Sequence, residues 1–190
     1  KEKTLEYSKK INRLINHHKK SKFKTETKDS WSENTILLIT YADNISKGIS
    51  GKSLHNFQEF YKKYLKKFIN SIHFLPFYPS SGDGGFSVKN HNEVDEIYGT
   101  WDNIKELSKN ANIMIDLVLN HASSESEWYK NFLKEKRPGK NYFYIVDKDY
   151  DCSNVIRPRD HNLLSQTKFL DNKKFLWCTF SYDQIDLNFK

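Results

Sequence analysis

The chain has 190 residues, enough for one sizeable hydrophobic core and too few for two domains of average size. Its net charge of +7 comes from 31 Lys and Arg set among 24 acidic residues, a mixture that favours solvated helix faces over a nucleic-acid surface. Cys152 and Cys178 supply neither a disulfide framework nor a zinc-ligand spacing. No apolar run approaches the roughly 20 residues of a membrane span. We therefore expect a cytoplasmic protein with no metal, cofactor, nucleic acid or membrane among its partners.

The N-terminal region reads as a helical extension. Residues 4–20 carry apolar side chains at helical spacing between charged ones, which predicts an amphipathic helix. The polar stretch that follows predicts a loop up to residue 34. Residues 1–34 are therefore expected to precede the main domain.

From residue 35 apolar runs alternate with amphipathic segments. Strands are predicted at 35–43, at 72–78 and from Asn112 onward, with helices at 53–68 and 101–110 between them. This strand–helix–strand–helix–strand order specifies parallel pairing through right-handed crossovers. Continuous apolar runs also predict strands that are buried on both faces, as in a parallel sheet.

The third strand segment reads N-I-M-I-D-L-V-L-N-H-A-S-S-E from Asn112 to Glu125. Asp116 interrupts its apolar run, and a buried acidic residue costs several kcal/mol unless it is paired. Polar residues at the carboxyl end of a parallel strand are where α/β barrels place their chemistry. The segment alone fits two interpretations of Asp116, a site residue or a buried cap on a neighbouring loop.

Beyond His121 the alternation ends. A short helical pattern at 128–133, an aromatic strand candidate at 142–146 and a hairpin at 169–180 that turns at 171–172 follow. A stretch of this length and aromatic content is too long for a simple loop and predicts an inserted domain.

Several motifs, in the same order, resemble glycoside hydrolase family 13, the α-amylase superfamily. D-L-V-L-N-H-A-S at 116–123 is similar to its third-strand motif D-x-x-x-N-H. Further stretches resemble the sucrose phosphorylase branch of this family: L-L-I-T-Y-A-D (37–43), L-P-F-Y-P-S-S-G-D-G-G-F (75–86), H-N-E-V-D with G-T-W-D (91–102), V-I-R-P-R (155–159) and L-W-C-T-F-S-Y-D-Q-I-D-L-N (176–188). Motifs in a fixed order are more specific than any one of them.

The resemblance implies an α/β fold, the N-terminal part of a (β/α)8 TIM barrel. Residues 35–123 would form its first three β/α units, and residues 124–190 a small B domain inserted after the third strand. The implied activity is retaining phosphorolysis of sucrose or a related α-glucoside to glucose 1-phosphate. The implied partners are the sugar, inorganic phosphate and the remaining half of the barrel.

The resemblance also assigns a donor subsite. Asp83 matches the aspartate that binds the glucosyl unit, although an Asx turn in a glycine-rich loop is the alternative. Phe86 matches the aromatic residue that lines this subsite. His91 and His121 match its two histidines.

Two further groups of residues are carried over from the same motifs. Asp116 and Asn120 match positions that support the site. Arg159 matches a B-domain arginine associated with phosphate and acceptor binding, because a guanidinium fork pairs with two phosphate oxygens. Arg157 is the alternative to Arg159 in this role, and a solvated loop arginine is the other interpretation.

Retaining chemistry needs a nucleophilic carboxylate and an acid/base carboxylate about 5 Å apart. In this family the nucleophile is an Asp within R-x-D-A on the fourth strand and the acid/base a Glu on the fifth, so both are expected beyond Lys190. R-P-R-D at 157–160 lies inside the insertion without an apolar strand around it. We therefore expect a fragment that is inactive by itself. An α-glucosidase or transglucosidase fragment and a non-catalytic sugar-binding remnant remain the alternatives.

Overall fold

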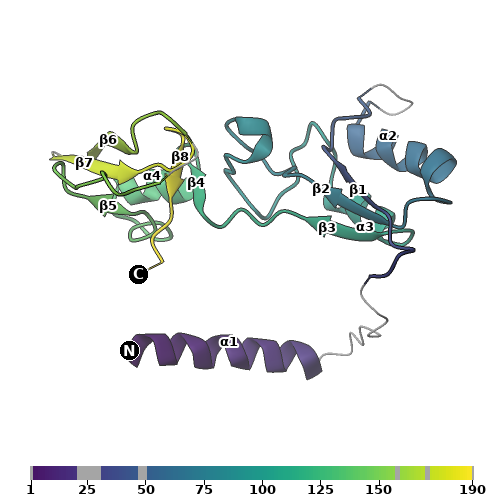
Figure 1. Ribbon diagram of the computed structural model, residues 1–190, viewed down its shortest axis with the longest axis horizontal. Coiled ribbons are helices and arrows are strands. Elements are labelled where there is room, and N and C mark those ends of the chain that lie inside the picture. The colour runs from purple at the N-terminus through teal and green to yellow at the C-terminus, as the bar shows by residue number, and fades with distance from the viewer. Residues whose placement is uncertain (1, 21–30, 47–50, 157–158, 170–171, 190) are drawn as a thin grey trace. The chain divides into compact units, whose positions relative to one another are not determined.

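The computed structural model (Figure 1) describes residues 2–20, 31–46, 51–156, 159–169 and 172–189. The chain divides into two compact units, residues 1–34 and 35–190. In the first unit, α1 (Glu2–Lys20) covers the segment in which the sequence predicts a helix. Its apolar side chains, among them Ile11 and Leu14, are exposed.

The second unit begins with the predicted parallel sheet. β1 (Leu37–Thr40), β2 (Ser71–Phe74) and β3 (Asn112–Ile115) pair in the order β1-β2-β3, parallel throughout. Between them run α2 (Ser53–Phe60), which continues as a π-helical turn to residue 65, and α3 (Trp101–Ser108). The structure thus confirms the mixed α/β class with its alternation of strands and helices.

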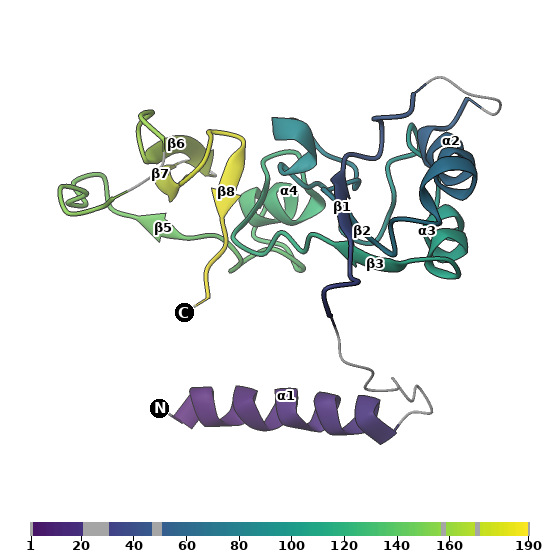
Figure 2. The same ribbon diagram turned by 45° about the vertical axis from the view of Figure 1, so that its right-hand side comes forward.

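Both helices pack on the same face of this sheet (Figure 2). The row formed by Leu38, Ile72 and Ile113 lies on the covered face, with Ile72 fully buried. Phe57 of α2 meets Phe74 of β2 edge to face, with ring centroids 5.1 Å apart. The first core therefore forms between the sheet and its two helices.

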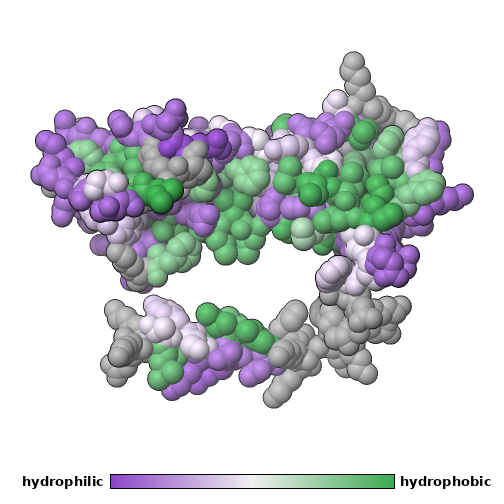
Figure 3. All heavy atoms as spheres, viewed as in Figure 1, coloured by the Kyte–Doolittle hydropathy of each residue, from purple (hydrophilic) through white to green (hydrophobic). Residues whose placement is uncertain are grey.

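The prediction that these strands are buried on both faces is wrong. On the opposite face, Leu37, Ile39 and Met114 are 44%, 58% and 47% exposed. The reason is that α2 and α3 share one side and that no described element covers the other. Figure 3 shows apolar residues gathered on the surface over β1–β3.

The third strand is also shorter than the sequence indicates. β3 ends at Ile115, and the apolar residues Leu117 and Leu119 are exposed on an extended segment that no ladder joins to the sheet. The chain then enters β4 (His121–Ser123), which pairs antiparallel with β8 (Gln184–Asp186).

The remaining elements build a second core. α4 (Glu127–Leu133) is capped at its N-terminus by Ser126, whose hydroxyl accepts a hydrogen bond from the Tyr129 backbone N–H. Phe132, Phe143 and Leu176 are buried between α4 and the strands β5 (Ile145–Val146), β6 (Leu164–Phe169) and β7 (Asn172–Trp177).

Two predictions for this region need correction. The hairpin is formed by β6 and β7 over residues 164–177, so it begins five residues earlier than the predicted 169. Its predicted turn at 171–172 lies partly outside the described residues. The aromatic candidate at 142–146 is a strand only at Ile145–Val146, because Phe143 makes an isolated bridge to Leu187 instead.

Because the two faces of the sheet are unequally buried, substitutions on them should differ in their effect on stability. Ile72→Ala should lower the free energy of unfolding by about 2–5 kcal/mol, because it leaves a cavity in a packed core. Ile39→Ala is the matched control on the neighbouring strand, and we expect it to cost about 1 kcal/mol or less. Urea denaturation of both variants measures the difference, and equal losses would show that the second face is covered in solution.

Candidate functional site

A cleft of about 540 Å³ collects residues from segments far apart in the sequence. Its walls are the loop after β2, the extended segment between β3 and β4, and the stretch that leads into β8. Six of the predicted site residues line it: Asp83, Phe86, Asp116, Asn120, His121 and Arg159.

Asp83 sits on a loop whose backbone needs glycine around it. The loop has left-handed φ angles at Asp83, Gly84 and Gly85, of +52°, +59° and +97°. A side chain on Gly85 would come within 2.4 Å of the Pro76 carbonyl oxygen, so only glycine fits there. The Asp83 carboxylate accepts a hydrogen bond from Gln184 Nε2 at 2.8 Å. This partner lies 101 residues along the chain, whereas an Asx turn would use a neighbouring backbone N–H.

His121, the first residue of β4, is buried, with 4% of its surface exposed. Its Nε2 lies 3.0 Å from the Phe86 carbonyl oxygen, and because a carbonyl can only accept, Nε2 carries the proton. Burial lowers the pKa of His121, outweighing the Phe86 hydrogen bond and the nearby carboxylates of Asp186 and Asp83, which raise it. The ring is therefore neutral, and its Nδ1 has no partner among the described residues and is left as an acceptor.

Asp116 finds a partner on the neighbouring strand. His73 Nε2 of β2 lies 3.3 Å from Asp116 Oδ1, although the two are not aligned as in a hydrogen bond. The backbone carbonyl of Asp116 accepts a hydrogen bond from Tyr78 Oη at 2.9 Å, and burial raises the pKa of Tyr78, with a smaller contribution from the Asp116 charge. Asp116 thus lines the cleft beside a histidine. His73 was missed, although it interrupts an apolar run on the strand next to that of Asp116.

Arg159 and Asn120 are exposed at the edge of the cleft. The Arg159 guanidinium makes no ion pair or hydrogen bond with any described residue. Asn120 is held through its backbone carbonyl, which accepts from the Leu187 N–H at 2.8 Å.

Two positions named in the sequence analysis have no place in this cleft. Arg157, the alternative to Arg159, lies outside the described residues. Lys190 also lies outside them, and it is no site residue itself. It marks only the point beyond which the nucleophilic Asp and the acid/base Glu are expected. That expectation stays a prediction.

His91 is the predicted site residue that does not line this cleft. Its Nε2 lies 2.9 Å from the Val118 carbonyl oxygen, and its ring stacks on Trp128 with centroids 5.7 Å apart. It lines a second, more apolar hollow of about 430 Å³ together with Trp128, Tyr142 and Phe189. The segment 117–119 lines both hollows and separates His91 from the other predicted residues.

The cleft also holds three residues that the sequence analysis missed as site residues. Tyr41 follows β1, Phe180 places its ring 5.2 Å from that of His121, and Gln184 is fully buried. The available signal was their position inside two motifs already quoted, L-L-I-T-Y-A-D and F-S-Y-D-Q. An exposed carboxylate beside a neutral imidazole and aromatic rings can bind a polyhydroxylated ligand by its hydroxyls and its apolar faces.

The described part of the chain offers neither a metal site nor a membrane-spanning helix. No cluster of three or more His, Cys, Asp or Glu side chains there could hold a metal ion. None of the helices there has the length and hydrophobicity that a membrane span requires.

Comparison with known proteins gives one family model and several phosphorylases that match most of the chain. Residues 61–190 match the family model described as alpha amylase, catalytic domain. The chain is 41% identical over 164 residues to glucosylglycerate phosphorylase from Escherichia coli K12, covering 86% of this chain. It is 32% identical over 166 residues to sucrose phosphorylase from Streptococcus mutans, covering 82% of this chain.

A solved structure gives the same result. The crystal structure of sucrose 6F-phosphate phosphorylase from Thermoanaerobacter thermosaccharolyticum superimposes with a TM-score of 0.73 at 30% identity, over 84% of this chain. The chain spans 29% of the length of the E. coli relative, 34% of the streptococcal one and 34% of the solved structure.

The environment of His121 predicts how stability depends on pH. Because its folded pKa is depressed, His121 contributes stability that is complete above the unfolded value of about 6.5 and declines as the pH falls through the folded pKa. We expect an NMR titration to give His121 a pKa below 6.5. His121→Gln should remove part of the fall in unfolding free energy on acidification below that pH. An unchanged pH profile together with an ordinary His121 pKa would contradict the neutral assignment.

Proposed function

The chain belongs to the alpha-amylase catalytic-domain family, and we propose that it forms the glucosyl-binding part of an α-glucoside phosphorylase. The observation that carries the proposal is the exposed Asp83 carboxylate, which lines the cleft beside the neutral His121 ring and the side chains of Phe86 and Phe180. A carboxylate accepts hydrogen bonds, so it suits the hydroxyl groups of a pyranose.

The charge of Asp83 supports a sugar ligand. The Asp83 carboxylate keeps Oδ1 for a ligand, since its hydrogen bond from Gln184 reaches Oδ2. A carboxylate accepting from a hydroxyl makes a charge-assisted hydrogen bond, roughly twice as strong as a neutral one. Phe86 and Phe180 supply apolar surface for the C–H faces of the ring. In this proposal Asp116 and Asn120 support the site, and His91 supports it from the neighbouring hollow.

Arg159 is the residue that would favour phosphate over water as the glucosyl acceptor. It lines the cleft, it is exposed, and no described carboxylate neutralises it. A guanidinium pairs with two oxygens of a phosphate dianion, whereas water gains little from the charge. The proposal therefore places phosphate beside Arg159, next to the glucosyl unit.

The relatives support this branch of the family. The E. coli protein is a glucosylglycerate phosphorylase at 41% identity, and the streptococcal protein a sucrose phosphorylase at 32%. Glucosylglycerate is therefore the first donor to test and sucrose the second. The leaving group itself stays open.

We further propose the division of the chain that the motifs imply. Residues 35–123 would be the first three β/α units of the barrel and residues 124–190 its B domain, since the chain leaves the parallel sheet after β3 and pairs antiparallel from β4 onward. The rest of the barrel would cover the exposed face at Ile39 and Met114. It would also supply both reacting carboxylates from beyond Lys190, since no R-x-D-A motif occurs in the 190 residues.

The proposal is tested in a chimera that joins this chain to the remaining length of the E. coli relative. We expect phosphate-dependent release of glucose 1-phosphate from glucosylglycerate or sucrose by the chimera and none by the 190-residue chain alone. In the chimera, Arg159→Ala should raise the KM for phosphate by an order of magnitude or more. Donor hydrolysis without phosphate should change much less.

Arg137→Ala is the matched control, because Arg137 is an exposed arginine of the same region that does not line the cleft. Equal losses of phosphorolysis and hydrolysis in Arg159→Ala would indicate a structural role for Arg159. Release of free glucose alone, from a chimera that never forms glucose 1-phosphate, would favour a hydrolase.

A further inference from the structure

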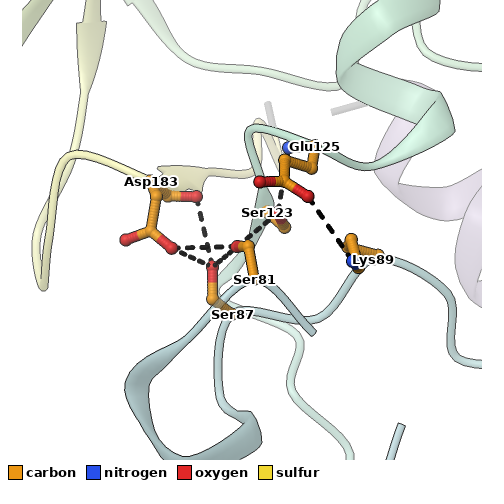
Figure 4. Close-up of polar contacts among 6 residues, drawn as sticks. All are labelled: Ser81, Ser87, Lys89, Ser123, Glu125 and Asp183. Atoms are coloured by element: carbon orange, nitrogen blue, oxygen red, sulfur yellow. Dashed lines mark hydrogen bonds and ion pairs between the residues drawn. The ribbon is translucent and has the colours of Figure 1, made fainter. Parts of the chain in front are cut away.

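A cluster of hydroxyl groups around one carboxylate lies beside the cleft without lining it (Figure 4). Ser81 and Ser87 flank the Asp83 loop, Ser123 ends β4, and Asp183 immediately precedes Gln184 of β8. Ser87 and Ser123 are fully buried. Glucosyl binding as described above leaves this cluster without a role.

Asp183 is the common acceptor of the cluster. Its Oδ2 accepts from Ser81 Oγ at 2.9 Å and from Ser87 Oγ at 2.7 Å. Its Oδ1 lies 2.6 Å from Ser181 Oγ, and its backbone carbonyl accepts from the Ser124 N–H at 2.7 Å. Three separate segments of the chain thus meet at one residue.

The hydroxyl groups around this carboxylate favour its charged form. Ser81 Oγ lies 2.8 Å from Ser87 Oγ and 2.7 Å from Ser123 Oγ, and in each pair either atom can donate. Ser123 Oγ also accepts from the Glu125 N–H. Hydrogen bonds to a carboxylate stabilise its ionised form. Burial raises the pKa of Asp183, but the hydrogen bonds from Ser181, Ser87 and Ser81 hold this pKa below its usual range, so the carboxylate is ionised at neutral pH.

Asp183 is connected to both partners of the Asp83–Gln184 hydrogen bond. On one side it holds Ser81 and Ser87, the two ends of the loop in which Asp83 has its left-handed φ. On the other side it is the residue before Gln184, whose Nε2 donates to Asp83. A residue in a sparsely populated backbone region persists only when its surroundings hold it there.

We propose that Asp183 is a positioning residue of the glucosyl site, an ionised clamp that fastens the Asp83 loop to Gln184 before any sugar binds. Holding the acceptor carboxylate in one rotamer removes an ordering cost that a ligand would otherwise meet. The consequence for sugar binding rests on the proposed function, whereas the clamp itself is a property of this chain.

The clamp is tested by the side-chain amide of Gln184 in the 190-residue chain. Glutamine-selective ¹⁵N labelling leaves three side-chain amides, those of Gln58, Gln166 and Gln184. In the wild type, hydrogen exchange of the Gln184 amide should be slow. At the same pH, Asp183→Asn and Ser87→Ala should accelerate it by about tenfold or more, because each removes acceptor charge or a donor from the clamp.

Glu125→Ala is the matched control, since the Glu125 side chain makes an exposed ion pair with Lys89 at 3.4 Å, and the substitution keeps the backbone N–H that donates to Ser123. It should leave Gln184 exchange unchanged. Slow exchange that persists in a folded Asp183→Asn would overturn the clamp, and if that variant does not fold, Ser87→Ala decides in the same way.

A second experiment, a glucose titration, tests the sugar site independently of the clamp. Glucose is titrated into the wild type and into Asp183→Asn, and we expect the variant to bind it at least about tenfold more weakly. In another outcome the wild type binds no glucose, while its Gln184 amide exchanges slowly and Asp183→Asn accelerates that exchange. This outcome would refute the sugar site and leave the clamp standing. Equal glucose affinity in both proteins would refute the positioning role.

Discussion

The antiparallel pairing of β4 with β8 is the contact on which the cleft depends. It sets His121 opposite Asp186 and Ser123 opposite Gln184. The pairing therefore brings the last strand of the described chain beside β4, the first strand after the parallel sheet. Asp83 belongs to the sheet side and Gln184 to the returning strand. Without this pairing the Asp83 carboxylate would have no partner, and the cleft would lack one wall.

Each of the two hydrophobic cores fixes the position of one part of the site. The first core lies between the parallel sheet and its helices and fixes where the loops after β1 and β2 begin. The second core, around Phe132, Phe143 and Leu176, fixes the strand that carries Gln184. The side chains of the candidate site lie on loops and strand ends between the two cores, where rigid elements can hold polar groups near solvent. His121 joins them, because it belongs to β4 and donates to the Phe86 carbonyl of the sheet-side loop.

The order of the elements in the first half of the unit could be predicted because it is written in local periodicity. Apolar runs and helical spacing specified β1, α2, β2, α3 and β3, and the succession of types specified parallel pairing. The burial of the second sheet face could not be predicted in this way. Residues such as Ile39 read as buried by composition, while their exposure depends on which other elements cover them.

The candidate site was predictable residue by residue but not in its contacts. Motif resemblance pointed to Asp83, His121 and Arg159, which the structure brings to one cleft. The partners of these residues lie at long separations and follow no period. Gln184 reaches Asp83 from 101 residues away, and only the β4–β8 register places it there. His91 shows the converse, since its motif lies between those of Asp83 and His121 while its ring turns into a different hollow beside Trp128.

The central claim is that the cleft bounded by Asp83, His121 and Gln184 binds a glucosyl unit. Chemical-shift mapping of the ¹⁵N-labelled chain during a glucose titration tests it most directly. The claim predicts saturable shifts at the Asp83 and His121 backbone amides and at the Gln184 side chain, with little change at the Trp128 indole N–H in the second hollow. Shifts confined to Trp128 and its neighbours, or no saturable shift at Asp83, would contradict it.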